Sequence, residues 1–265
     1  MVDADYPFDT SVAHPARVYD YWLGGKDNFA ADREAAEAVI AARPSILFDI
    51  RANRAFLGRA VRWLAAEAGV RQFLDIGTGI PAADNTHQVA QGVAPTSRIV
   101  YVDNDPIVLV HARALLTSNA EGATAYLEGD LRQPEPILAG AAKTLDFGQP
   151  IAVLLIGVLH LIADAENPNE IINTLMAAVP SGSYLALTQP ASDINAEVVA
   201  EGARRYNQHV STKQTRRNHA ETARFFDGLE LVEPGLVQVH RWRPDPDAEG
   251  LDREVSAWGG IGRRR

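Results

Sequence analysis

The sequence predicts an α/β protein built on a Rossmann-like, doubly wound and mainly parallel sheet. Short apolar runs alternate with amphipathic stretches from residue 70 to residue 188. Such alternation is typical of parallel strands joined by right-handed helical crossovers. The run at residues 151–156 is apolar throughout, as expected for a central strand covered on both faces. Glycines and carboxylates follow successive runs, at the sheet edge where open α/β folds bind ligands.

Residues 1–68 are predicted to form a helical extension ahead of the sheet. Pro15 and the pair Gly24-Gly25 bound a short first helix, since proline is typical of the first helical turn and glycine of the position past the end. The alanine-rich residues 30–42 predict a second helix. Residues 51–68 carry apolar side chains at three- and four-residue steps, which indicates a longer amphipathic helix.

The first helix carries Tyr21 and Trp22 directly before its glycine pair. Two interpretations fit these residues. The aromatic side chains could pin a short helix to the body, or the helix could be a flap that closes over a site, with the glycines as its hinge. In the second interpretation Tyr21 and Trp22 are walls of a substrate pocket. Arg54 is the arginine of the third helix that we expect to point toward the same site.

The sheet domain is predicted to cover residues 69–245, followed by a C-terminal tail at residues 246–265. Strands are expected at residues 70–76, 98–103, 123–128, 151–156 and 183–188. Helices are expected at residues 83–92, 106–118, 136–142, 168–179, 195–205 and 218–226. Two further strands, at residues 229–232 and 236–239, are so close in sequence that they can pair directly only as an antiparallel hairpin.

Composition narrows the function classes. The chain has 265 residues and a net charge of −9, which disfavours broad binding to nucleic acid or to an anionic membrane surface. It has no cysteine, so disulfides, thiolate metal sites and cysteine nucleophiles are excluded. The N-terminal residues lack the pattern of a signal peptide, and the longest apolar run is too short to cross a bilayer. We therefore expect a cytoplasmic enzyme.

Three signals at successive strand ends predict a nucleoside-bearing cofactor. Gly77 and Gly79 follow the first strand, Asp103 follows the second, and Asp130 follows the third. Glycine permits φ > 0 and close approach to the backbone. A carboxylate at the second strand end is placed to accept both ribose hydroxyls, and one at the third could accept from a purine amine. Taken singly, each residue could instead shape or cap a turn without a ligand.

The sequence resembles class I S-adenosylmethionine-dependent methyltransferases. It is most similar to an actinobacterial family of S-adenosyl methyltransferases that was first described as a domain of unknown function. The similarity covers nearly the whole chain and rests on these stretches: residues 17–28 (Arg-Val-Tyr-Asp-Tyr-Trp-Leu-Gly-Gly-Lys-Asp-Asn), 75–81 (Asp-Ile-Gly-Thr-Gly-Ile-Pro), 101–106 (Tyr-Val-Asp-Asn-Asp-Pro), 158–160 (Val-Leu-His), 233–235 (Glu-Pro-Gly) and 242–244 (Trp-Arg-Pro). The resemblance implies fold and cofactor, but no particular substrate.

The implied cofactor is S-adenosylmethionine. The residues expected to bind it are Gly77, Thr78, Gly79, Asp103, Asn104, Gly129, Asp130 and Leu131. Pro81 stands where the general class often has a third glycine, so other groups must hold the amino-acid end of the cofactor. We expect Gly25, Lys26 and Asn28 to do so. The acidic balance favours a small-molecule acceptor over nucleic acid or a membrane, and the oligomeric state stays open.

His160 is the predicted general base, because it follows the fourth strand at the same edge of the sheet. A histidine that is merely hydrogen-bonded beneath the sheet edge fits the position equally well. His14, His209 and His219 have no local partner pattern and are predicted to lie at the surface. No His-Glu-x-x-His spacing occurs, so no metal site is predicted.

Two other functions remain open at this point. Residues 77–82 satisfy the Gly-x-Gly-x-x-Ala fingerprint of NAD-dependent oxidoreductases, and Asp103 lies 26 residues after Gly77. The position of Asp130 and the late hairpin argue against that function. A protein that binds S-adenosylmethionine as a sensor, without catalysis, is the second alternative.

Overall fold

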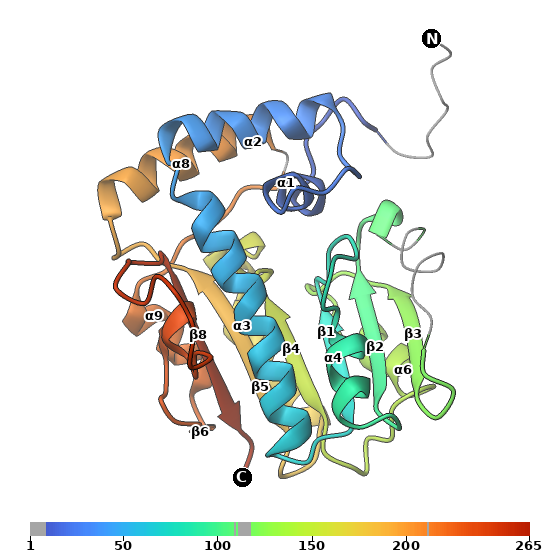
Figure 1. Ribbon diagram of the computed structural model, residues 1–265. Coiled ribbons are helices and arrows are strands. Elements are labelled where there is room, and N and C mark those ends of the chain that lie inside the picture. Colours follow the sequence, from blue (N-terminus) through green and yellow to red (C-terminus); the bar gives the residue numbers. More distant parts are fainter. Residues whose placement is uncertain (1–8, 109, 111–117, 211) are drawn as a thin grey trace.

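The computed structural model describes residues 9–108, 110, 118–210 and 212–265, and it confirms the predicted fold class (Figure 1). The parallel strands are β1 (Gln72–Ile76), β2 (Arg98–Asp103), β3 (Ala123–Glu128), β4 (Ala152–Ile156) and β5 (Tyr184–Pro190). The α-helices are α1 (Pro15–Trp22), α2 (Ala30–Ala42), α3 (Ile46–Ala66), α4 (Thr86–Val93), α6 (Pro134–Ala141), α7 (Pro168–Ala178), α8 (Ala196–His209) and α9 (His219–Ala223). The helix predicted at residues 106–118 lies largely outside the described residues.

The sheet has the strand order β3-β2-β1-β4-β5-β8-β6. The strand order reverses between β1 and β4. Strands β2 and β3 follow β1 on one side of it, and β4 then pairs with β1 on the other side. Such a reversal leaves a crevice at the carboxyl ends of the strands. The strands between residues 72 and 190 all point their carboxyl ends to this same edge (Figure 1).

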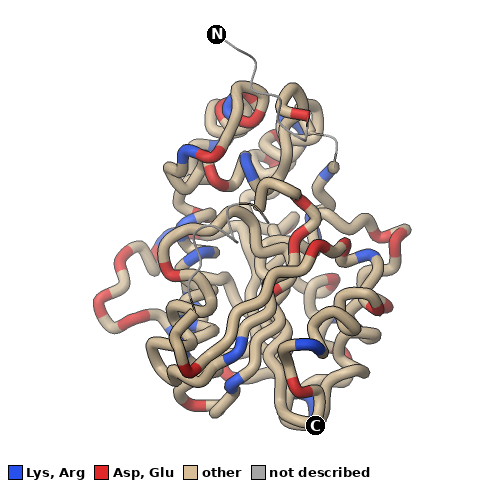
Figure 2. Tube along the Cα trace, turned by 90° about the vertical axis from the view of Figure 1, so that its right-hand side faces the viewer, with Lys and Arg blue, Asp and Glu red and all other residues tan. Residues whose placement is uncertain are grey.

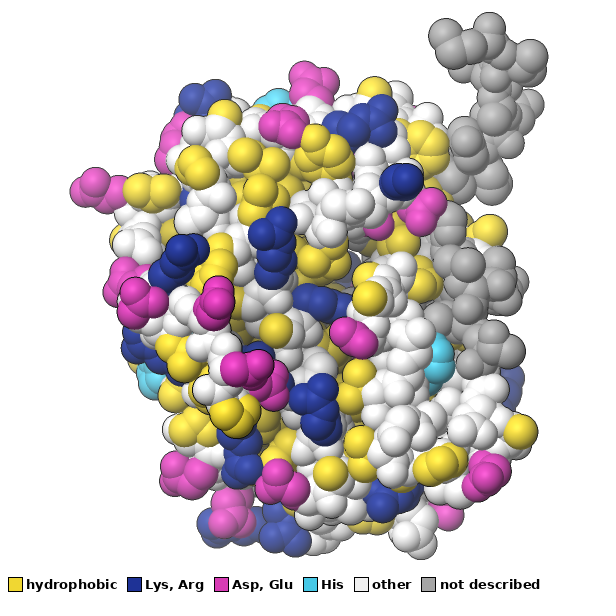
Figure 3. Space-filling view, viewed as in Figure 1, with side chains coloured by type: hydrophobic (Ala, Val, Ile, Leu, Met, Phe, Trp, Pro, Cys, Tyr) yellow, Lys and Arg dark blue, Asp and Glu magenta, His cyan; other side chains and the backbone are white. Residues whose placement is uncertain are grey.

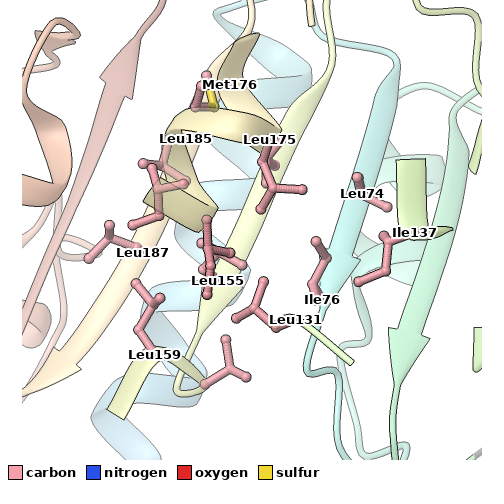
Figure 4. Close-up of a cluster of buried hydrophobic side chains, with 14 of the residues drawn as sticks. Leu74, Ile76, Leu131, Ile137, Leu155, Leu159, Leu175, Met176, Leu185 and Leu187 are labelled. Carbon is pink, nitrogen blue, oxygen red and sulfur yellow. The ribbon is translucent and has the colours of Figure 1, made fainter. Parts of the chain in front are cut away.

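Helices cover both faces of the sheet, which explains why β4 is apolar throughout and its neighbours β1 and β5 are mostly apolar. On one face, α3 and α4 pack over Phe73, Ile99 and Leu154. On the other face, α6 and α7 cover a cluster of leucine and isoleucine side chains (Figure 4). Ile137 and Leu175 reach this cluster from the helices, and Leu155 reaches it from β4. The buried aliphatic surface on both faces fixes the sheet that positions the site.

The antiparallel part of the sheet is present, but its pairing differs from the predicted hairpin. The short strands β6 (Glu230–Leu231) and β7 (Val237–Gln238) both pair with β8 (Ala257–Arg263) and not with each other. Strand β8 also runs antiparallel to β5 along seven residue pairs. The range expected as a C-terminal tail therefore contributes a strand to the sheet, and Arg263 lies within that strand.

The predicted N-terminal extension is divided between two places. Helix α3 begins five residues earlier than expected and packs on the sheet, because Phe56, Ala60 and Leu64 are fully buried there. Helices α1 and α2 instead pack with α8 into a separate cluster around Val18, Trp22 and Tyr206. We call α1, α2 and α8 the helical cover. Figures 1 and 2 show the cover above the carboxyl ends of the parallel strands.

None of the described helices is both long enough and apolar enough to cross a membrane. The division of the chain at residues 68 and 245 stays a prediction.

Candidate active site at the carboxyl edge of the sheet

The glycine turn after β1 takes the conformation that the sequence predicts. Gly77 has φ of 74° and Gly79 has φ of 66°, which L side chains rarely adopt. A Cβ on Gly77 would lie 2.4 Å from Cγ2 of Val158, so the loop after β4 occupies that space. No heavy atom lies within 4 Å of the corresponding position on Gly79. Gly77 is thus required by the protein's own packing, whereas Gly79 leaves open space at the cavity wall.

Asp103 lies at the end of β2 and fixes the turn. Its Oδ2 accepts a hydrogen bond from the Gly79 backbone N–H at 2.8 Å, and its Oδ1 accepts one from the Asp105 N–H at 2.9 Å. Burial raises the pKa of Asp103, while these two backbone donors act in the opposite direction. The carboxylate is therefore held in one orientation, with the remaining lone pairs of its two oxygens free to accept from a ligand.

A small cavity of about 50 Å³ joins the ends of β1, β2 and β3. Its walls include six of the residues predicted to bind a nucleoside, namely Gly77, Asp103, Asn104, Gly129, Asp130 and Leu131. The structure thus brings all three strand-end signals to one place. Arg132 also lines this cavity, and its guanidinium lies 3.2 Å from an oxygen of Asp130. Asp130 therefore has an ion-pair partner that sequence reasoning did not anticipate.

A larger cavity of about 170 Å³ lies between the helical cover and the sheet edge. It shares Gly77, Asp103 and Asn104 with the small cavity, so the two spaces adjoin. Thr78 and Gly79 also line it, together with Arg54 from α3. Trp22 contributes to its wall as predicted and is held by a hydrogen bond from Nε1 to the Ala36 carbonyl at 3.3 Å.

The loop after α1 does not lie where the sequence predicted. Gly25, Lys26 and Asn28 line neither cavity, and the Asn28 Nδ2 donates to Asp20 Oδ2 at 2.8 Å. A Cβ on Gly25 would collide with the Asp20 side chain, so this glycine serves local packing. The side chain of Asp20 thus contacts both ends of this loop, at Gly25 and at Asn28.

Tyr21 is also placed differently from the prediction. Its hydroxyl donates to Glu37 on α2 at 2.5 Å, and it lines neither cavity. His14 shows the opposite error, since it was predicted at the surface. In the structure His14 lines both cavities, and its Nδ1 lies 2.9 Å from Asp105 Oδ2. The segment before α1 therefore reaches the loop that follows β2, a contact between residues about 90 positions apart.

His160 lines the larger cavity. Burial, together with the charges of Arg216 and Arg217, lowers the pKa of His160 to about 3. The imidazole is therefore neutral near pH 7, and its Nδ1 is buried without a hydrogen-bond partner among the described residues. Its place beside the cofactor turn fits the predicted base. The ring is nevertheless a weak proton acceptor, because burial and two nearby cations oppose its protonation.

We expect His160 to make the folded protein less stable in mild acid. The unfolded chain protonates this histidine near pH 6.5, whereas the folded protein does so only near pH 3. Stability is thus fully present above pH 6.5 and falls with the pH through that window, by up to about 2 kcal/mol between pH 6.5 and pH 5. Urea unfolding at pH 7.5 and pH 5 should show a smaller pH dependence for His160→Gln than for the wild type.

The comparison with His160→Gln also removes an opposing effect. Burial raises the pKa of Asp75 to about 6, so its protonation favours the folded state as the pH falls toward 4. Asp75 is present in both proteins, and its contribution cancels in their difference. An equal pH dependence in the two proteins would contradict the assigned state of His160.

Two arginines of the larger cavity were not predicted from the sequence. Arg43, at the C-terminal end of α2, forms a buried ion pair with Asp49 in the first turn of α3. Arg216 lies in the segment between α8 and α9 and has no carboxylate within 4.0 Å among the described residues. Neither arginine belongs to a periodic pattern or a motif, so no signal in the sequence marks it. The described residues contain no cluster of His, Asp and Glu that could hold a metal ion.

The arrangement fits S-adenosylmethionine. Asp103 offers carboxylate oxygens where a ribose is expected, and Asp130 lines the same cavity at the next strand end. The open position beside Gly79 leaves room for a ligand to lie against the backbone. The larger cavity continues from the same wall, so a ligand in the small cavity can extend toward it.

Comparisons with known proteins agree with this site. A family model described as S-adenosyl methyltransferase matches residues 2–265. No curated protein matches the sequence. A DUF574 family protein from Streptomyces avermitilis is 46% identical, with a TM-score of 0.94 over 97% of this chain and 99% of the other. A candidate methyltransferase from Thermobifida fusca is 39% identical, with a TM-score of 0.91 over 99% of this chain and 100% of the other.

More distant solved structures share the fold alone. The mitomycin 7-O-methyltransferase MmcR is 17% identical, with a TM-score of 0.53 over 98% of this chain and 74% of the other. The family match extends over nearly the whole length, and both similar structures are covered almost completely. The chain therefore belongs to the S-adenosyl methyltransferase family, and its cofactor is S-adenosylmethionine.

Proposed function

We propose that this protein transfers a methyl group from S-adenosylmethionine to a small-molecule acceptor bound in the larger cavity. The observation that carries the proposal is the pair of adjoining cavities that share the wall of Gly77, Asp103 and Asn104. The small cavity carries the residues expected to hold the nucleoside, and the larger one lies under the helical cover. A donor and an acceptor bound in these spaces meet at the glycine turn.

When bound, S-adenosylmethionine supplies a methyl group that its sulfonium makes electrophilic. The chain's own residues then have three tasks. Asp103 and the glycine turn hold the nucleoside in place, and the helical cover excludes water from the acceptor. Alignment of two bound reactants can contribute about 7–11 kcal/mol to the lowering of the barrier. His160 is the proposed group for accepting a proton when the acceptor must lose one.

The surface supports a small acceptor. On the face that Figure 3 shows, basic and acidic side chains of the described residues alternate and leave no broad positive field. Nucleic-acid binding depends on such a field.

The sheet also argues against an NAD-dependent oxidoreductase. The antiparallel β8 lies between β5 and β6, whereas the sheet of the dinucleotide-binding fold continues with parallel strands.

Calorimetry with S-adenosylhomocysteine and with NAD tests the proposal. We expect wild-type protein to bind S-adenosylhomocysteine and not NAD. Gly79→Ala adds a methyl group where the structure leaves open space, so it should weaken S-adenosylhomocysteine binding by about tenfold or more, since 1.4 kcal/mol corresponds to tenfold. Both Gly79→Ala and its control Gly228→Ala should lose about 1–2 kcal/mol of stability from the strained φ.

Gly228 is a matched control because it has φ of 81°, no heavy atom within 4 Å of the added methyl, and a place away from both cavities. NAD binding without S-adenosylhomocysteine binding would reverse the assignment.

Labelled methyl transfer from S-adenosylmethionine into cell extract tests the acceptor. Label in the macromolecular fraction would contradict a small acceptor, and retained cofactor binding with no label would favour a sensor.

A further inference from the structure

The side chains of Arg216 and Arg217 have opposite environments. Residues 214–217 run past the ends of β4 and β5. Thr215 N donates to His160 O, after β4, at 2.6 Å, and Arg217 N donates to Pro190 O, at the end of β5, at 3.2 Å. Successive side chains of an extended segment point to opposite sides. Arg217 accordingly turns into the protein body, whereas Arg216 lines the larger cavity.

Arg217 is fully engaged in holding the fold together. Its guanidinium donates to Asp164 Oδ1 at 2.8 Å and to the carbonyls of Ile162 at 2.7 Å and Leu159 at 3.1 Å. These bonds fasten the segment to the loop after β4. Arg217 therefore has a structural role that accounts for its burial.

Arg216 lacks a comparable set of partners. Its Nη1 donates to the Ala191 carbonyl at 3.3 Å, and its Nε is buried without a hydrogen-bond partner among the described residues. Burial lowers the pKa of Arg216 to about 9, and the charge of Arg43 acts in the same direction. The side chain still carries its charge at pH 7. Arg216 as a whole is partly exposed, but its Nε is shielded from solvent. A cation in such a place without a counter-ion is unfavourable unless a ligand supplies the negative charge.

Among the described residues, no carboxylate of this cavity forms an ion pair with Arg216, whose hydrogen bond goes to a carbonyl, and each carboxylate has other partners. Asp49 is paired with Arg43. Asp75 accepts a hydrogen bond from Thr86 at 2.6 Å, and Asp103 is bound to two backbone N–H groups. His160, whose pKa reflects the nearby Arg216, is neutral and has a free Nδ1. Arg216 and His160 thus leave two nitrogen atoms of one cavity wall unsatisfied.

The remaining wall is more apolar than polar, although Asn53, Thr188 and Gln214 also line it. Aliphatic and aromatic side chains of the helical cover and α3 line it, namely Trp22, Val39, Ile46, Ile50, Leu57 and Tyr206. A ligand that satisfies both parts of the wall needs an apolar body and one anionic group. Arginine recognises carboxylate oxygens through two parallel N–H donors, which suits a planar carboxylate.

We propose that the methyl acceptor is a small, largely apolar carboxylate whose anionic group pairs with Arg216 and lies beside His160. This inference rests on the proposed methyl transfer and adds the chemical class of the acceptor. Arg216 is then a specificity-determining residue that touches the substrate. The carboxylate of the cofactor is the other possible partner of the same guanidinium, and the experiment separates the two sources.

The test uses benzoate, phenylacetate and 4-hydroxybenzoate, each paired with its neutral primary amide. Thermal unfolding of the full chain is followed with each compound, with and without S-adenosylhomocysteine. We expect at least one acid to raise Tm more than its amide in wild-type protein. Arg216→Met should weaken binding of that acid by about tenfold or more, the change expected for a hydrogen bond to a charged group. Arg216→Lys should retain part of the preference.

Arg205→Met is the matched control, because Arg205 is half-exposed on α8, pairs with Glu201 at 2.7 Å and lines neither cavity. It should keep the full preference for the acid. Ligand-free Arg216→Met should be at least as stable as the wild type, since it loses an unpaired buried charge. If Arg216 instead stabilised the fold, its replacement would lower the Tm of the ligand-free protein. A lower Tm in both Arg216→Met and Arg216→Lys would overturn the proposal.

Three further results would also overturn it. The first is equal stabilisation by every acid and its amide in wild-type protein, and the second is an acid preference that persists in Arg216→Met. The third concerns the cofactor: if Arg216→Met weakens S-adenosylhomocysteine but leaves 5′-methylthioadenosine unaffected, the guanidinium binds the cofactor's carboxylate. Absence of S-adenosylhomocysteine binding in the wild type would refute the proposed function, while the comparison of acids and amides without it still answers the question about Arg216.

Discussion

Replacing Asp103 with alanine is expected to weaken S-adenosylhomocysteine binding by about 100-fold or more. Asp103 lines the small cavity, and we expect its carboxylate to accept from both ribose hydroxyls. A hydrogen bond to a charged group contributes about 1.5–3 kcal/mol. Two such bonds correspond to at least two factors of ten. The alanine variant also leaves the Gly79 and Asp105 N–H groups without their acceptor, which loosens the turn that the cofactor contacts. Isothermal titration calorimetry measures the change.

Asp105→Ala is the control for loss of local structure. Asp105 is a buried carboxylate two positions away, it accepts from the Ile107 N–H at 3.0 Å, and it lines neither cavity. Its removal should reduce stability but change the affinity for S-adenosylhomocysteine by less than about threefold, well under the 1.4 kcal/mol of a tenfold change. Similar affinities of the Asp103→Ala and Asp105→Ala proteins would show that Asp103 acts only on the loop.

The parts of the site that the sequence predicts are those coded within a few residues. Gly77 and Asp103 stand at the ends of apolar runs, and Asp130 stands two residues past the end of β3. Parallel strands bring such positions to one edge whatever the details of packing. The strand boundaries were predictable for the same reason, since buried parallel strands are continuous apolar runs. Local pattern thus determines both the sheet and the cofactor turn.

Strand β8 shows why the antiparallel part could not be predicted. Its central residues include Gly259, Gly260 and Gly262, and glycine weakens a strand signal. The structure gives the reason for the glycines. A Cβ on Gly259 would lie 2.8 Å from Val239, and one on Gly262 would lie 2.8 Å from Phe226. The need for glycine arises from side chains distant in sequence, so a reading of the segment alone predicts a tail.

The residues that meet in the larger cavity could not be predicted from local sequence patterns either. His14, Arg43 and Arg216 meet there from three separate segments, and each lacks a local pattern. Gly25, Lys26 and Asn28 were expected to hold the amino-acid end of the cofactor because Pro81 replaces a third glycine, and they line neither cavity. In the structure the Asp20 side chain holds the loop that carries them. Contacts of this kind depend on the packing of the helical cover, which periodicity does not specify.

Replacing Arg43 alone with methionine is expected to lower the free energy of unfolding by about 3–5 kcal/mol, the usual cost of leaving one member of a buried ion pair unpaired. The side chains of Arg43 and Asp49 are only 2% and 6% exposed, and they join the end of α2 to the start of α3. Arg43 also packs against Gly202 of α8, at 3.4 Å from the position of an added Cβ. Guanidinium-induced unfolding measures the loss.

The double variant Arg43→Met, Asp49→Leu separates the charge from the packing. Because both charges are removed together, most of the stability should return, to within about 1 kcal/mol of the wild type, as found when buried pairs are replaced by apolar residues of similar size. Burial also screens the pair from salt, so the single variant should lose the same amount at high ionic strength. A double variant as unstable as Arg43→Met would mean that the shape of the arginine, and not its charge, joins the helical cover to the sheet domain.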